Sequence, residues 1–262
     1  MKHRWSIRLA IAGAAVATAT AAFATHSWNN YHWARTASSF TLSVTDSVSA
    51  LWDDELQGTL NQWGQAQALN FTVVAADDGD RTRKRCSMVA GQIRVCNAAY
   101  GQNGWLGLAS IGLDSQGHID QGTAKMNDSY DWYFTQEERN HVMCQEVGHL
   151  FGLGHTSEDG SSQSTCMDYS SDPSSQWPNS HDYQMIASIY AHLDSYNSFV
   201  SGSTPPPCHG KGCNTAAAAG AINGEVPMGI LVHHGDHEEV WVASRPDGGY
   251  WVHHVRLAPE RH

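Results

Sequence analysis

The segment from Cys144 to His155, CQEVGHLFGLGH, carries several side chains of the kinds that bind a metal ion. On a helix, Gln145 and His149 are four residues apart, so they lie one turn apart on the same face. Glu146 lies next to that face, within reach of a water molecule at the metal. A following glycine can end the helix in a left-handed turn and let His155 return to the same point. The pattern predicts a zinc site with one open position, where Glu146 acts as general base in a hydrolysis.

Gln145 is an unusual ligand, because its neutral amide oxygen is a weaker zinc donor than imidazole, thiolate or carboxylate. Its side chain is long enough to reach the metal, so we expect lower zinc affinity rather than loss of the chemistry. His141 cannot replace it, because it lies about 12 Å along the helix from His149; we expect a surface residue or one that supports a ligand. Cys144 lies about 140° around the helix from His149 and points away from the site.

Hydrophobic periodicity predicts the elements that hold these residues. Alternating apolar residues or short apolar runs predict five strands, at residues 40–48, 70–77, 91–98, 104–114 and 122–128. Apolar residues at helical spacing predict helices at 49–66, from about Thr135 through the metal-binding segment, and at 181–193.

The metal-binding segment resembles the HExxHxxGxxH signature of the metzincin metallopeptidases at every position but the first, which Gln145 occupies. Downstream, STCMDYSS is similar to the metzincin Met-turn, which implies that Met167 lies beneath the zinc. The similarity to the matrixin branch extends over about residues 31–197 and includes the helix with Trp52 and Trp63.

This resemblance implies an α+β fold of the zincin type, with a twisted, mostly parallel five-stranded sheet and three helices. One zinc ion would lie at the floor of a cleft. A protein or peptide substrate would bind along the edge strand near Trp105–Ile111, adding itself to the sheet as a further strand. No prodomain fits between Thr25 and the first strand, so we do not expect latency through a prodomain cysteine.

The spacing between Met167 and Tyr169 is similar to that of astacins and serralysins. In those families the tyrosine can be an extra zinc ligand and can stabilise the oxyanion. Tyr169 has the same role in one interpretation. In the other, it is a packed tyrosine whose hydroxyl is satisfied by hydrogen bonds.

Composition divides the chain into four regions. Residues 1–24 have a basic start, an apolar stretch and a small-x-small site, which predict a cleaved signal peptide and a secreted, extracellular or periplasmic protein. Residues 25–197 form the predicted catalytic domain, 198–225 a Pro- and Gly-containing linker, and 226–262 a small β-rich tail that either docks on the domain or is weakly ordered. The net charge of −11 argues against nucleic acid and anionic membranes as partners, and we expect a monomer without a membrane span.

The six cysteines favour disulfides, because all of them follow the predicted signal peptide. Connectivity does not follow from sequence alone. Pairing of neighbours predicts three bonds: Cys86–Cys96, Cys144–Cys166 and Cys208–Cys213. Cys144 as a metal ligand is the alternative that its position on the helix disfavours.

Further histidines and acidic residues allow other metal sites. Two strands of the tail could gather five histidines into a metal-binding surface, although a solvated pair of His-rich strands is the simpler interpretation: His233, His234, His237, His253 and His254. Calcium could bind one of two acidic groups, but their spacing fits no established calcium loop and ordinary acidic turns are the favoured interpretation: Asp77, Asp78 and Asp80, or Asp114 and Asp120.

Together these features predict a secreted zinc-dependent metalloendopeptidase that hydrolyses peptide bonds with a metal-activated water. Zinc would be held by Gln145, His149 and His155, with Glu146 as the base. The alternative is a metal-poor, catalytically inactive binding protein with the same fold.

Overall fold

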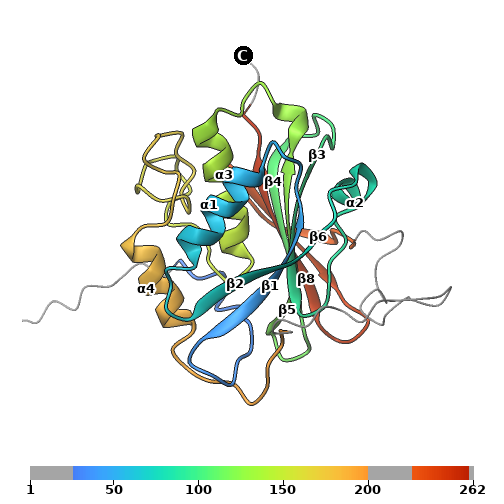
Figure 1. The fold of residues 1–262 in the computed structure, drawn as a ribbon, viewed down its shortest axis with the longest axis vertical. Coiled ribbons are helices and arrows are strands. Elements are labelled where there is room, and N and C mark those ends of the chain that lie inside the picture. The colour runs from blue at the N-terminus through green and yellow to red at the C-terminus, as the bar shows by residue number, and fades with distance from the viewer. Residues whose placement is uncertain (1–25, 200–225, 260–262) are drawn as a thin grey trace, which may run out of the picture.

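The computed structural model describes residues 26–199 and 226–259. The predicted signal peptide, nearly all of the predicted linker and the pair Cys208 and Cys213 lie outside the described residues. One eight-stranded sheet has the order β2-β1-β3-β5-β4-β8-β7-β6 (Figure 1). Its strands are β1 (Phe40–Ser47), β2 (Leu69–Ala76), β3 (Gln92–Ala98), β4 (Trp105–Leu113), β5 (Ile119–Asn127), β6 (Ile230–His234), β7 (Glu238–Ser244) and β8 (Tyr250–Leu257).

The first five strands form the sheet that the resemblance implied. β1 pairs in parallel with β2 and β3, and β3 pairs in parallel with β5. β4 is antiparallel to β5 and would be the edge of this five-stranded unit. The mostly parallel, α+β architecture predicted from the sequence is therefore confirmed.

The tail extends this sheet instead of forming a separate hairpin. β8 is antiparallel to β4 along its whole length, from Trp105 opposite Leu257 to Leu113 opposite Tyr250. β7 and β6 follow as further antiparallel strands. Of the two outcomes expected for the tail, docking is the one observed. An unpaired β4 edge would expose a row of backbone N–H and C=O groups, and β8 satisfies them.

Three helices occupy one side of the sheet, as Figure 1 shows: α1 (Asp53–Trp63), α3 (Gln136–His149) and α4 (Ser180–Ile189). The chain also forms a short helix α2 (Asp80–Arg85) and a 3₁₀ turn η1 (Asp128–Tyr130). α2 was not predicted from sequence, because its six residues are polar and none is buried. Asp80 starts this helix and its carboxylate binds Arg83, 2.5 Å away, which favours the acidic-turn interpretation for this residue.

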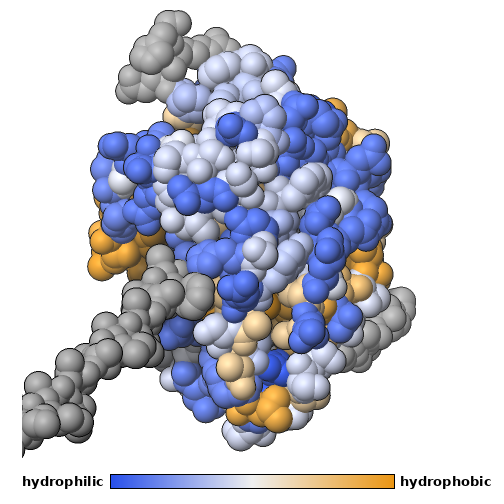
Figure 2. Space-filling model, turned by 90° about the vertical axis from the view of Figure 1, so that its left-hand side faces the viewer, coloured by the Kyte–Doolittle hydropathy of each residue, from blue (hydrophilic) through white to orange (hydrophobic). Residues whose placement is uncertain are grey.

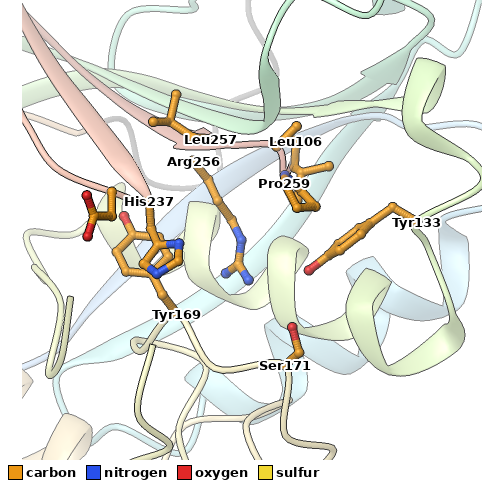
Figure 3. Close-up of a pocket in the computed structure, with 10 residues that line it drawn as sticks. Leu106, Tyr133, Tyr169, Ser171, His237, Arg256, Leu257 and Pro259 are labelled. Atoms are coloured by element: carbon orange, nitrogen blue, oxygen red, sulfur yellow. The ribbon is translucent and has the colours of Figure 1, made fainter. Parts of the chain in front are cut away.

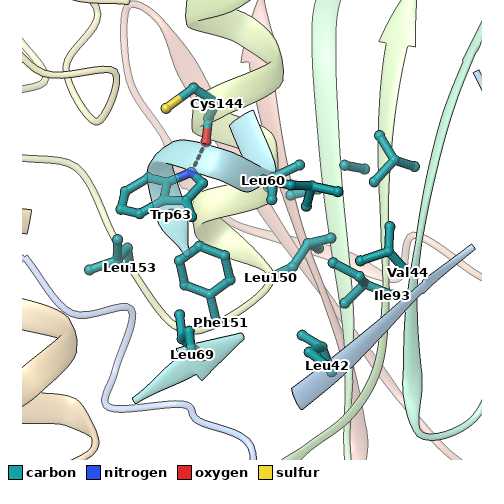
Figure 4. Close-up of a cluster of buried hydrophobic side chains, with 14 of the residues drawn as sticks. Leu42, Val44, Leu60, Trp63, Leu69, Ile93, Cys144, Leu150, Phe151 and Leu153 are labelled. Atoms are coloured by element: carbon teal, nitrogen blue, oxygen red, sulfur yellow. Dashed lines mark hydrogen bonds between the residues drawn. The ribbon is translucent and has the colours of Figure 1, made fainter. Parts of the chain in front are cut away.

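The main core lies between the helices and the sheet (Figure 4). Trp63 of α1 and Phe151 after α3 are fully buried and pack edge to face, with ring centroids 5.1 Å apart. The Trp63 Nε1–H group donates a hydrogen bond of 3.0 Å to the Cys144 carbonyl, so one indole both fills the core and holds α3 in place.

α3 carries the metal-binding segment, and its ends are defined by specific residues. The Thr135 hydroxyl caps the first turn by accepting from the Glu138 N–H. Gly152 follows the helix with φ of +100°, and a Cβ there would lie 1.8 Å from the Tyr31 carbonyl oxygen. Gly148 allows Met167 to pack against the helix, since a Cβ at that position would lie 2.7 Å from its sulfur. The prediction that Met167 lies under this segment agrees with that contact.

The face of the molecule that carries α4 and the loop after α3 is mostly hydrophilic, with apolar side chains in small groups (Figure 2). Within the described ranges, no helix is both long enough and apolar enough to span a bilayer.

Candidate metal centre

His149, at the end of α3, and His155, after the turn at Gly152, come together as expected from the sequence. Their Nε2 atoms are 3.1 Å apart. Two ligands of a tetrahedral zinc ion, each about 2.1 Å from the metal, are roughly 3.4 Å apart, so this separation is within a few tenths of an ångström of a ligand pair. The other nitrogen of each ring has a partner: His149 Nδ1 bonds to the Leu153 carbonyl at 2.8 Å, and His155 Nδ1 to the Glu238 carboxylate at 3.0 Å. These bonds orient both Nε2 atoms towards a common point.

Both rings are suited to metal binding because both are neutral. Burial and, to a smaller extent, the neighbouring His254 lower the pKa of His155 to about 3. Burial also lowers the pKa of His149 to well below its usual value. A neutral imidazole offers the lone pair that a zinc ligand requires.

A third histidine reaches this point from the tail. His254 lies on β8, opposite Ala109 of β4, and is 3% exposed. Its ring is 4.2 Å from that of His149 and 4.4 Å from that of His155. One ring nitrogen from each of these histidines lies within 4.8 Å of the others. His254 Nε2 contacts Glu238 at 2.5 Å, whereas its buried Nδ1 has no hydrogen-bond partner among the described residues.

Gln145, the predicted first ligand, has both ends of its amide engaged elsewhere. Its Nε2–H donates to the Asp168 carbonyl at 2.9 Å, and its Oε1 accepts from Arg256 at 2.7 Å. Gln145 is fully buried and Arg256 is 3% exposed. The guanidinium therefore has a buried acceptor, and the amide oxygen already has a strong, charge-assisted bond.

Glu146 occupies the position expected of the base. It is fully buried, and neither carboxylate oxygen has a hydrogen-bond partner in the described part of the chain. Burial raises the pKa of Glu146 to about 8, although Arg256 and the Ala109 backbone oppose the shift. β4 passes so close that a Cβ at Gly107 would lie 2.3 Å from Glu146 Oε1. A buried acid without a partner beside a histidine cluster is typical of a functional site.

Tyr169 lies beside the cluster, with its ring 4.3 Å from that of His155. Its hydroxyl donates to Glu238 at 3.0 Å, so in this state it is a packed tyrosine with a satisfied hydroxyl. Glu238 thus contacts Tyr169, His155 and His254 through the same oxygen.

A cavity of about 400 Å³ opens next to the site (Figure 3). Arg256 projects into its centre, between Tyr133 on one side and Tyr169 with His237 on the other. Tyr169 and His237 are stacked with ring centroids 5.4 Å apart. The guanidinium carbon of Arg256 also lies 5.4 Å from the Tyr169 ring centroid. β8 therefore supplies side chains to both the histidine cluster and the cavity.

Cys144 and His141, the two residues on this helix that were expected not to bind the metal, have other partners. The structure pairs Cys144 with Cys166, as predicted, and also Cys86 with Cys96. His141 supports the site from behind, with its Nε2 2.8 Å from the same Asp168 carbonyl that Gln145 binds. It is buried rather than on the surface.

The structure corrects the favoured interpretation of the tail histidines. His253 and His254 are buried, not solvated, because β8 is enclosed between β4 and β7. His253 bonds to the Ser110 hydroxyl on the opposite face of the sheet from the cluster. His233 and His234 remain exposed, and His233 contacts Glu238 at 3.1 Å.

The second acidic group has protein partners instead of a calcium geometry. Asp114 accepts from the backbone N–H groups of Gln116 and His118 within a turn. Asp120 binds Arg245 at 2.8 Å. The acidic-turn interpretation favoured from sequence therefore describes Asp114, whereas Asp120 lies in β5 and pairs with Arg245.

Two members of this centre, Glu238 and Arg256, were not predicted from sequence, and His254 was considered only as part of a histidine surface on the tail. In the segment HHVR, His254 and Arg256 are two residues apart, so they lie on one face of a strand. That signal was present, but nothing in the sequence indicated which strand would lie next to β8.

The donor set fits zinc. Neutral imidazoles with their second nitrogens bound, and a buried partnerless imidazole nitrogen, are the features of a zinc site with supporting hydrogen bonds.

The sequence model of the matrixin family matches residues 32–191. No curated protein matches the chain. Among solved structures, the chain is similar to high choriolytic enzyme 1, a hatching enzyme zinc-protease from Oryzias latipes (medaka fish). The two are 11% identical, with a TM-score of 0.34, over 61% of this chain and 94% of that one. β6, β7 and β8 follow the matched residues, so Glu238, His254 and Arg256 come from outside them.

Proposed function

We propose that this chain, which belongs to the matrixin family of zinc metallopeptidases, is an exported zinc-dependent metalloendopeptidase. In this proposal its own tail closes the cleft. The observation that carries the proposal is the convergence of His149, His155 and the partnerless Glu146 in one buried site. The two disulfides fit an oxidising compartment. A signal peptide at residues 1–24 would deliver the chain there.

In the closed state, His149, His155 and His254 would hold the zinc ion. His254 offers a buried imidazole nitrogen that lacks a partner, whereas Gln145 would have to give up two hydrogen bonds to turn its oxygen to the metal. Zinc supplies Lewis acidity, which polarises a peptide carbonyl and activates water for attack. Glu146 would accept the proton of that water once its own carboxyl is ionised, which the positive charge of a bound zinc ion favours by lowering its pKa.

The tail strand occupies the edge along which a peptide would bind. β8 runs antiparallel to β4 and pairs with all of Trp105–Leu113, including the predicted substrate-binding stretch Trp105–Ile111. A substrate strand can use that edge once β8 has left it. We therefore place peptide hydrolysis in an open state and regard the described state as a closed, latent one.

Departure of β8 would exchange one ligand for another. His254 and Arg256 lie on the same face of β8, so both leave Gln145 and the zinc site together. Loss of Arg256 frees the Gln145 amide oxygen, which can then act as the third ligand beside His149 and His155. The ligand set predicted from the sequence would thus belong to the open state.

The second candidate function is a non-catalytic binding protein on the same fold. It is favoured by the combination of an amide at position 145 and a covered β4 edge. A binding protein requires no open state, so loosening β8 should not produce peptide cleavage, whereas the peptidase proposal predicts that it should.

The two functions separate in one experiment on the full exported chain. We would measure zinc per chain and casein cleavage, with and without a chelator, for the wild type and for Arg256→Ala, which weakens tail docking. The peptidase proposal predicts slow, chelator-sensitive cleavage that increases several-fold per bound zinc in Arg256→Ala. Arg83→Ala is the matched control, because that arginine binds Asp80 in α2 and does not contact the tail.

Glu146→Ala should abolish cleavage in both backgrounds. Adding Gln145→His to Arg256→Ala should tighten zinc binding, because imidazole is a better zinc donor than an amide oxygen. Zinc-bound protein with no cleavage in any of these variants would support the binding-protein function instead.

A further inference from the structure

Three histidines and an aspartate form a second cluster that shares no residue with the metal centre above. His32 precedes the first strand, His118 lies in the turn between β4 and β5, and His192 and Asp194 follow α4. Three parts of the chain that are far apart in sequence therefore bring imidazole and carboxylate groups together at one end of the sheet.

The donor atoms of His32, His118 and Asp194 all lie within 4.8 Å of one another, and His192 adds a fourth nitrogen close to two of them. His32 Nε2 and His192 Nε2 are 3.1 Å apart. Asp194 Oδ1 lies 3.4 Å from the Nε2 atom of His118 and 3.6 Å from those of His32 and His192. Ligands of a tetrahedral zinc ion are about 3.4 Å from one another. The observed separations fall on both sides of this value.

Hydrogen bonds orient two of the rings with their lone pairs inwards. His32 Nδ1 is 2.8 Å from the Asn30 carbonyl, which can only accept, so Nδ1 carries the proton. His118 Nδ1 is 2.8 Å from the Tyr196 hydroxyl, which itself donates to Asp114 and so accepts from His118. In the neutral form of each ring, Nε2 therefore presents its lone pair to the centre of the cluster.

The carboxylate is held in the same manner. Asp194 Oδ2 accepts from the Arg35 N–H at 2.9 Å, and the Asp194 N–H donates to the Arg35 carbonyl at 2.8 Å. Oδ1 is left facing the three imidazoles.

One carboxylate charge can compensate only one protonated histidine, because further protonated rings nearby would repel one another. With Nδ1–H on both His32 and His118, at least one Nε2 lone pair of these two rings then still faces the Asp194 carboxylate. A divalent cation at the centre would compensate the carboxylate and engage the imidazole lone pairs together.

We propose that His32, His118, His192 and Asp194 bind a structural zinc ion. Three imidazoles and one carboxylate are donors that zinc accepts, and four protein ligands close the coordination shell, as in structural sites. The side chains of His32, His118 and Asp194 are 10–16% exposed, whereas that of His192 is 55% exposed and gives the ion a route of entry. The ion would join the N-terminal segment, the β4–β5 turn and the segment after α4.

The backbone around the cluster is already built to receive such a link. The Ile119 N–H donates to the His32 carbonyl at 2.8 Å, next to the bridge between Trp33 and Ile119. The Ser198 N–H donates to the Ala34 carbonyl at 3.0 Å. Metal binding therefore requires little rearrangement and would fasten contacts that separate the cluster from the solvent.

Zinc stoichiometry of the full chain tests this proposal independently of peptidase activity. We would remove the first centre with His149→Ala and His155→Ala, dialyse against zinc and count the metal. This background should keep one zinc per chain, and adding His118→Ala should remove it. The wild type should hold two zinc ions and the single variant His118→Ala one. This second comparison tests the same site if the variant that lacks both centres does not fold. Cobalt in place of zinc should show the intense visible absorption of a tetrahedral site.

Tyr196→Phe and His234→Ala refine the test. Tyr196→Phe removes the hydroxyl that orients His118 but no ligand, and should weaken zinc binding at this site by about 10–100-fold. His234→Ala is the control, since its ring is exposed and contacts Glu239, and it should leave the stoichiometry unchanged. A background without His149 and His155 that binds no zinc, or binds it equally well after His118→Ala, overturns the proposal. Neither result depends on whether the first centre is catalytic.

Discussion

The hydrogen bond between Arg256 and Gln145 should couple the stability of the tail to that of α3. The perturbation is a double-mutant cycle of Gln145→Ala, Arg256→Ala and the double variant. Both side chains are buried and their atoms are 2.7 Å apart, so solvent screening does not weaken the bond. A hydrogen bond to a charged group contributes about 1.5–3 kcal/mol, and we expect a coupling energy of about 2 kcal/mol.

The single variants should differ in size. Gln145→Ala leaves a buried guanidinium without this acceptor, which costs more than the loss of a neutral bond. Arg256→Ala also removes the cation over the Tyr169 ring, which contributes about 0.5–2 kcal/mol. A coupling of 2 kcal/mol corresponds to roughly 4–8 °C in melting temperature for a domain of this size.

Urea unfolding in the presence of a chelator measures the cycle without any contribution from metal. A control cycle combines Gln145→Ala with Arg245→Ala, because these two residues share no partner. Their effects on the free energy of unfolding should add within about 0.5 kcal/mol. The effects of Gln145→Ala and Arg256→Ala on the free energy of unfolding should exceed additivity by more than that limit. If they add within it, β8 is not docked in the stable state in solution, and the closed site inferred from its docking is wrong.

Three further variants test single contacts. Trp63→Phe removes the indole bond to the Cys144 carbonyl and should lower the free energy of unfolding by about 1 kcal/mol, measured in urea. Gly107→Ala places a Cβ against Glu146 and should reduce casein cleavage while zinc content, measured by metal analysis, stays unchanged. Replacing Cys144 and Cys166 with alanine opens a loop of 22 residues and should cost about 3 kcal/mol by calorimetry; a loss below 1 kcal/mol would show that the loop is constrained by other contacts.

The helix that carries the motif could be predicted from sequence because its determinants are local. Thr135 caps its start, Gly152 permits its end, and the four-residue spacing fixes where Gln145 and His149 point. The same local rule placed Cys144 on the opposite side, where it meets Cys166. The mostly parallel arrangement of the first five strands came from the resemblance to metzincins, not from periodicity.

The role of the tail could not be predicted in the same way. Its strands were visible in the sequence, but pairing between β8 and β4 joins residues about 140 positions apart, and no local pattern encodes that choice. The substitution at Gln145 acquires a structural meaning once Arg256 is placed beside it. His32, His118 and His192 went unnoticed for the same reason, because isolated histidines have no spacing from which a shared site can be inferred.

The number of imidazoles bound to zinc in the motif site tests the central claim most directly. X-ray absorption at the zinc edge, on a His118→Ala chain that lacks the second site, reports this number. The account predicts three imidazoles, from His149, His155 and His254, and two after His254→Ala is added. Two imidazoles before and after that change would contradict it, because the tail would then contribute nothing to the metal.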